Sequence, residues 1–153
     1  MRNSTVGLII GIVILFLGFN VQTIYFIGCI QWRDDVNTVQ NATRNFVDSV
    51  IDTGEIAEDT LADFNLALAS CQSTYAYKIY HEEIVTNPDP TSSDPNATKT
   101  TWIYTDDLDN WNTGDFITVE VKQVSENFFQ RISSSMLSMV FGNRDCTLSG
   151  MVR

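Results

Sequence analysis

The most regular feature of the chain is an uninterrupted apolar segment near its start. Residues 6–30 contain no Asp, Glu, Lys or Arg across 25 positions. As an α-helix this segment would be roughly 37 Å long, which is enough to cross the hydrocarbon layer of about 30 Å with some tilt. A signal peptide is the alternative, but the apolar run is longer than a usual signal core and no small-residue cleavage site precedes Trp32. The pattern favours a membrane-spanning helix.

One face of this helix is expected to pack against other helices. Gly7, Gly11, Gly18 and Gln22 follow one another at spacings that place them within about 60° on the helix surface. Small residues let helix backbones approach closely, and an amide such as that of Gln22 needs a polar partner away from water. A lone anchor that tolerates a few glycines is the alternative. We favour packing against copies of this chain or against a partner helix.

The same face continues beyond the apolar segment. Trp32 and Val36 extend it, and charged and polar residues occupy the other side, so the pattern becomes that of an amphipathic helix. No proline interrupts the pattern, and Gly54 is a plausible stop. We therefore predict one continuous helix over 7–54, about 70 Å long. Two helices broken near Trp32 are the alternative.

The remainder predicts a small α+β head over 55–153, after a membrane-spanning and stalk helix over 1–54. Three segments of alternating polarity are expected to pair as a three-stranded antiparallel sheet, and an amphipathic helix is expected to cover it. The expected strands are 75–84, 116–124 and 146–152, and the expected helices are 58–69 and 126–141. The inner face of the last helix is predicted to consist of Phe128, Phe129, Ile132, Met136, Met139 and Val140. Residues 86–100 hold all three prolines and are predicted to form a surface loop.

Composition and motifs argue against several function classes. Nine Lys and Arg stand against nineteen Asp and Glu, and the formal charge of −10 disfavours a nucleic-acid binder. His81 is the only histidine, and we interpret it as a residue on the surface of a strand. Asp106, Asp107 and Asp109 lack the spacing of a calcium loop and are interpreted as a solvated acidic turn. No Gly-rich phosphate loop and no nucleophile motif occurs. We therefore expect neither an enzyme nor a metal or cofactor site.

The cysteines and one sequon give weaker indications. Cys71 precedes the first predicted strand and Cys146 opens the last, and a disulfide between them would add roughly 4 kcal/mol in the chain-entropy model. Two free thiols in a reducing compartment are the alternative, and Cys29 is expected to stay a thiol in either case. Asn96, in its loop, would be the natural acceptor in a cell that N-glycosylates.

Several short segments resemble small membrane-anchored, pseudopilin-like proteins associated with tight-adherence (Tad) pilus loci of clostridial-type bacteria. The similar segments are 46–50, 53–56, Leu61, Phe64, 75–79, 113–122 and 149–153. The resemblance implies a structural part of a pilus-like system with no catalytic residues. The chain departs from the pilin pattern after Gly7, where residues 8–12 contain no glutamate.

These observations lead to one expectation about function and two alternatives. We expect a pilin-like subunit that self-assembles through its N-terminal helix. It would lie in the membrane before assembly and in a cell-surface filament afterwards, with other pilus-assembly components as further partners. The first alternative is a single-pass membrane protein whose ectodomain binds a partner or a surface. The second is a membrane-bound regulatory subunit of an envelope machine.

Overall fold

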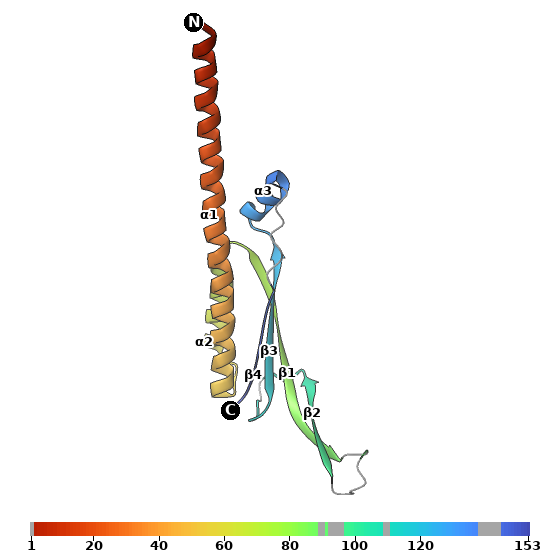
Figure 1. Cartoon of the computed structure of the whole chain (residues 1–153). Helices are drawn as coiled ribbons and strands as arrows, with labels where there is room; N and C mark the ends of the chain where they lie inside the picture. The colour runs from red at the N-terminus through yellow and green to blue at the C-terminus, as the bar shows by residue number, and fades with distance from the viewer. Residues whose placement is uncertain (1, 89–90, 92–96, 109–110, 138–144) are drawn as a thin grey trace.

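The computed structural model describes residues 2–88, 91, 97–108, 111–137 and 145–153. Figure 1 shows a long helix that runs beside a twisted sheet and extends far beyond it at its N-terminal end. The elements are α1 (Arg2–Thr53), α2 (Glu58–Ser70), β1 (Thr74–Pro88), β2 (Thr98–Thr105), β3 (Phe116–Ser125), α3 (Phe128–Leu137) and β4 (Cys146–Met151). The predicted α+β class is confirmed.

The continuous helix predicted over 7–54 is also confirmed. α1 runs without a break from Arg2 to Thr53. It ends at Gly54, whose φ of 69° is a conformation that favours glycine. The N–H of Gly54 donates to the carbonyl oxygen of Val50 at 2.9 Å, which satisfies one of the last open carbonyls of the helix. The alternative of two helices broken near Trp32 is therefore wrong.

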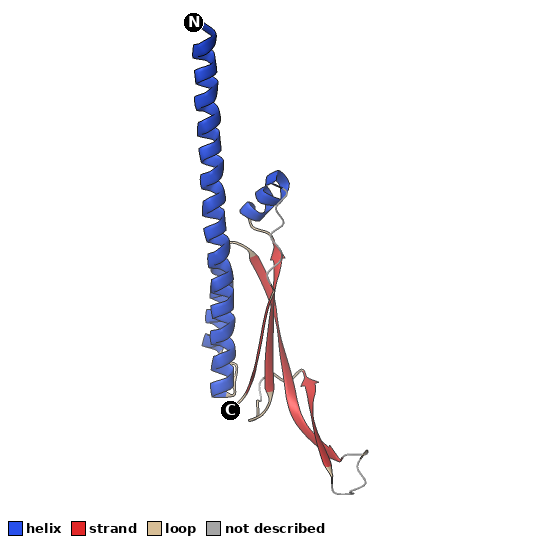
Figure 2. Cartoon of the chain, viewed as in Figure 1, coloured by secondary structure: helices blue, strands red, loops and turns tan. Residues whose placement is uncertain are grey.

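The sheet has four antiparallel strands in the order β2-β1-β3-β4, so the prediction of three strands is wrong. The additional strand, β2, pairs with the second half of β1, from His81 opposite Thr105 to Pro88 opposite Thr98. These two strands form a hairpin that projects away from α1 (Figure 2). Part of the predicted loop over 86–100 therefore belongs to strands.

The hydrophobic core lies between the sheet and the C-terminal half of α1. Val47 and Val50 of α1 are buried together with Val119 and Val121 of β3. β4 approaches α1 so closely that a Cβ atom on Gly150 would collide with the side chain of Ile51. The core thus contains residues from both predicted segments, the helix over 1–54 and the head over 55–153.

α2 completes the core by packing beside α1 and against β1. The ring of Phe64 stacks on that of Phe46 at a centroid distance of 4.9 Å. The same Phe64 ring meets Tyr77 of β1 edge-on at 5.0 Å. The helix predicted over 58–69 is therefore confirmed, and it joins α1 to the sheet.

The prediction that the last helix covers the sheet is wrong. α3 lies beyond the end of the sheet and contacts α1, because the C-terminal half of α1 already occupies the core face (Figure 2). Phe128, expected on the inner face, is 77% exposed, and Ile132 is only half-buried. Residues 138–141 of the predicted helix lie outside the described residues, as do the side chains of Phe129 and Met136.

Candidate functional site

The N-terminal half of α1 is an exposed apolar surface. Its exposed large apolar side chains range from 46% exposure at Ile30 to 75% at Leu15. Among the described residues, α1 is the one helix long and apolar enough to cross a membrane. The helix could therefore anchor the chain in a membrane.

The predicted packing face lies open along this half. No atom lies within 4 Å of a Cβ placed on Gly7, Gly11 or Gly18, and the side chain of Gln22 is exposed. At 100° per residue, Val50 lies on this same face of α1, further along the helix, where it is buried against the head. The packing of the four residues against another helix stays a prediction, because no second helix of the described part of the chain lies against the three glycines.

Trp32 and Val36 differ from these four residues. Both are half-buried, at the level where α1 begins to contact the head. Val36 lines a small cavity together with Val39, Tyr75 and Cys146. Within one chain, these two predicted packing residues therefore lie beside the head rather than on the open surface.

A buried carboxylate that the sequence analysis did not predict fixes the head to α1. Asp35 is 6% exposed, although its place among charged residues indicated the wet side of the helix. Its Oδ1 accepts the backbone N–H of Gln72 at 3.0 Å, and its Oδ2 accepts that of Ser73 at 3.2 Å. Because a carboxylate forms strong bonds with N–H groups, this pair of bonds holds the α2–β1 connection at one height along α1.

Replacing Asp35 with alanine is expected to loosen the head from α1. Each buried N–H left without an acceptor costs about 1–3 kcal/mol. Urea unfolding of the full chain in detergent micelles, followed by tryptophan fluorescence, would show the loss as a lower midpoint. Asp34→Ala removes an exposed neighbouring carboxylate and should leave the midpoint nearly unchanged. Equal midpoints for the two variants would contradict the role assigned to Asp35.

The interpretation of His81 as a surface residue is wrong. The His81 side chain is 2% exposed and that of Asp115 is 1% exposed, with 3.0 Å between Nε2 and Oδ2. The Nδ1 atom of the ring faces the carbonyl oxygen of Asp107. Asp115 also accepts the backbone N–H of Ile84 at 3.1 Å and that of Asn112 at 2.7 Å. The pair therefore ties β1 to the turn that precedes β3.

The electrostatics of this pair favour the charged carboxylate. Burial raises the pKa of Asp115, but the N–H groups of Asn112 and Ile84 and the His81 ring lower it, and the resulting pKa lies below its ordinary value. Imidazole and carboxylate groups serve in acid–base catalysis, but both side chains are too buried here to reach a substrate.

The predicted disulfide between Cys71 and Cys146 is wrong, because all three cysteines are free thiols. β3 lies between β1 and β4, so the two cysteines adjoin strands that are not neighbours. Burial first, and then the charge of Asp35, raises the pKa of Cys71 to about 11. Burial likewise raises the pKa of Cys146. Both thiols are poor nucleophiles as a result, since the thiolate is the reactive form.

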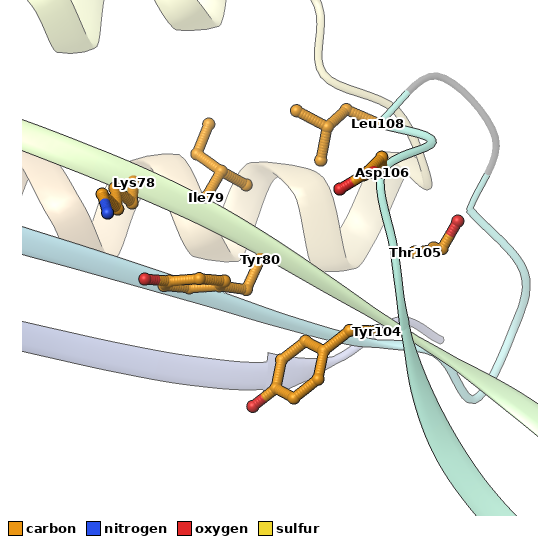
Figure 3. A pocket seen from close by; sticks show the side chains of 7 residues that line it. All are labelled: Lys78, Ile79, Tyr80, Tyr104, Thr105, Asp106 and Leu108. Atoms are coloured by element: carbon orange, nitrogen blue, oxygen red, sulfur yellow. The ribbon is translucent and has the colours of Figure 1, made fainter.

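The head carries a cavity large enough for a small ligand or a partner side chain. It has a volume of about 490 Å³. It lies just past the end of β2, along a part of β1 that pairs with β3 but no longer with β2. Figure 3 shows the side chains that line it: Lys78, Ile79, Tyr80, Tyr104, Thr105, Asp106 and Leu108. The rings of Tyr80 and Tyr104 meet edge-on at 6.1 Å, and the hydroxyl of Tyr80 donates to Glu120 at 3.3 Å.

Two predicted features cannot be placed. Asn96 and Asp109 lie outside the described residues. Within the described ranges, no group of three or more His, Cys, Asp or Glu could hold a metal ion. No protein-family model, curated protein or solved structure matches this chain.

Proposed function

We propose that this chain is a pilin-like structural subunit that assembles through the N-terminal half of α1 into a pilus or envelope filament. The observation that carries the proposal is that the two halves of the unbroken helix α1 have different surroundings. From Val39 onward the buried residues of α1 belong to the core of the head, whereas the apolar residues from Val6 to Ile30 are exposed. A helix that is apolar all round requires lipid or other helices as its surroundings.

The open glycine face favours other helices as the final surroundings. Gly7, Gly11 and Gly18 would let a second helix approach closely, which an anchor surrounded only by lipid does not need. The amide of Gln22 would find a partner on a neighbouring helix more readily than in hydrocarbon. Asn20 and Thr23 already bond to carbonyl oxygens of their own helix, at 2.7 Å and 2.9 Å.

The rigid joint between head and helix suits the same role. Asp35 and the core residues of α1 fix the head on the second half of the helix, so each copy would present its head in the same way. In the proposed assembly, copies bundle through the first half and the acidic heads face outward. The chain would lie in the membrane before assembly and in a surface filament afterwards.

The second candidate function is a single-pass anchored ectodomain that binds a partner or a surface. The observation that favours it is the cavity beside Tyr80 and Tyr104, whose volume falls within the range of ligand sites. In this case the first half of α1 would be an anchor only, and the cavity would be the functional site.

Electron microscopy separates the two functions. The full chain, purified in detergent and then freed of it in the presence of lipid, is expected to form filaments or ordered oligomers. Dispersed single heads on vesicles, at all protein concentrations, would contradict the filament proposal and favour the anchored ectodomain.

A further inference from the structure

α3 exposes a phenylalanine at its start and buries two polar side chains. Phe128 is 77% exposed, whereas Gln130 and Ser133 are 2% and 1% exposed. In a helix that packs on an aqueous protein, the apolar face is normally the buried one. The surroundings of α3 in the complete system are therefore expected to include something apolar that the single chain lacks.

Hydrogen bonds at the start of α3 fix this orientation. The Oδ1 of Asn127 accepts the N–H of Gln130 at 2.8 Å, and the Oε1 of Gln130 accepts the N–H of Asn127 at 2.9 Å, as in a capping box. The same Oε1 accepts a hydrogen bond from Nε2 of Gln123, at the end of β3, at 2.7 Å. Because these bonds join the start of α3 to the sheet, the helix cannot turn Phe128 inward without breaking them.

The level of α3 along α1 is the second observation. α3 packs beside Gly28, which is buried although it lies in the apolar segment. A crevice of about 150 Å³ between the two helices is lined by Ile24, Ile27, Phe128 and Ile132, together with Gly28, Gln31 and Gln72. Ile24 and Ile27 are 55% and 48% exposed. The apolar surfaces of the two helices thus meet where the apolar segment of α1 ends.

We propose that α3 is an interfacial membrane helix that lies in the leaflet facing the head, with its Phe128 side among the upper acyl chains. The inference rests on the membrane stage of the proposed function, because α1 must insert for α3 to reach the bilayer. The lipid surface is chosen over a second copy because the apolar side of α3 is continuous with the surface of α1 that faces lipid. Arg131 is exposed on the same helix and can reach the headgroups.

The charge of the chain indicates which lipid should be used. Nineteen acidic residues against nine basic ones would repel an anionic surface. The apolar contact, and not charge, is therefore expected to hold α3 to the bilayer. Vesicles of zwitterionic phosphatidylcholine are the matching probe.

The test uses the full chain in these vesicles with one added tryptophan. Phe128→Trp places the probe on the apolar side of α3, and Ser134→Trp places it at an exposed polar position of the same helix. Lipids brominated near the headgroup end of the acyl chains should quench the added fluorescence of Phe128→Trp and leave that of Ser134→Trp unquenched. The signal of the three native tryptophans, measured in the unchanged chain, is subtracted.

Each outcome has one meaning. Flotation with the vesicles reports insertion of α1, independently of α3. If the chain floats and brominated lipid quenches the added fluorescence of neither variant, the interfacial role is refuted and the membrane stage of the proposed function stands. If the chain does not float, both fail. If Phe128→Trp becomes shielded from aqueous acrylamide only as the protein density rises, with no quenching by lipid, a second copy covers α3 and the lipid proposal is overturned.

Discussion

Replacing Asp115 with alanine is expected to remove a large share of the stability of the head. The change leaves the ring of His81 and the N–H groups of Ile84 and Asn112 buried without an acceptor. Each buried polar group left without its hydrogen-bond partner costs about 1–3 kcal/mol, so losing several partners at once costs several kcal/mol. A domain of this size has only about 5–15 kcal/mol in total. Urea unfolding of the full chain in micelles should show the midpoint falling sharply.

Trp111 provides a local reporter for this experiment. Its ring stacks on His81 with 3.8 Å between the ring centroids, so loss of the pair should alter the environment of the indole. Asp115→Asn keeps one acceptor oxygen and should lie between the native chain and Asp115→Ala. Asp106→Ala, at an exposed acidic neighbour, is the matched control. An alanine variant as stable as this control would contradict the structural role of Asp115.

The same residue predicts the direction of acid sensitivity. The pKa of Asp115 in the folded chain lies below its ordinary value of about 3.8. Its contribution is therefore complete above pH 3.8 and is lost as the pH falls through the lower, folded pKa. The difference in stability between the native chain and Asp115→Asn should shrink over that acid range. If the difference in stability between the two chains stays constant over this acid range, the ionised form of Asp115 does not stabilise the head.

The long helix was predictable because each signal for it is local. An uncharged run, the absence of proline and a glycine at position 54 are properties of neighbouring residues, and helix formation depends on such properties. The burial of Asp35 was not predictable. Its carboxylate bonds to N–H groups 37 and 38 residues further along the chain, and no local pattern reports such a contact.

β2 was missed for a different reason. Strand prediction relies on alternation between a buried and an exposed face, but the burial of β2 does not alternate and most of its residues are exposed. The hairpin projects beyond α1, so neither of its faces acquires a core pattern (Figure 1). Its aromatic and β-branched residues Trp102, Ile103 and Tyr104 were the available signal.

His81 shows where a signal existed but was interpreted wrongly. It continues the alternating series of Tyr77 and Ile79, which places it on the same face of β1. The alternation predicts that His81 lies on the core-facing side of β1, where its ring needs polar partners. The identity of the partner Asp115 depends on the register of β1 and β3, which pairs His81 with Ile117 and cannot be obtained from one strand alone.

The exposure of Phe128 on α3 has a similar origin. The sequence shows a helix with an apolar side, and the usual inference is that this side covers the nearest sheet. Two elements compete for that sheet, and α1 covers it because its second half is amphipathic and joined to the head through α2. Both amphipathic helices were predicted from the sequence, but the sequence does not show which of them covers the sheet.

Replacing Gly11 with leucine is expected to weaken assembly strongly while leaving insertion and the head intact. Among the described residues, no atom beyond the neighbouring turns of α1 lies within 4 Å of a Cβ at this position, so one copy can accommodate the larger side chain. Between copies it would force the helices apart, at about 1–3 kcal/mol for each overpacked contact. That range corresponds to roughly 5- to 150-fold weaker self-association.

The control separates packing from hydrophobicity. Leucine favours both helix formation and lipid, so Gly11→Leu should insert at least as well as the native chain. Val13→Leu places the same leucine side chain on the opposite side of α1, because position 13 lies about 200° around the helix from position 11. This variant should assemble normally. Assembly would be measured by energy transfer between labelled copies in vesicles and by electron microscopy. If Gly11→Leu forms filaments or oligomers as readily as Val13→Leu, the open glycine face is not the surface through which the copies meet.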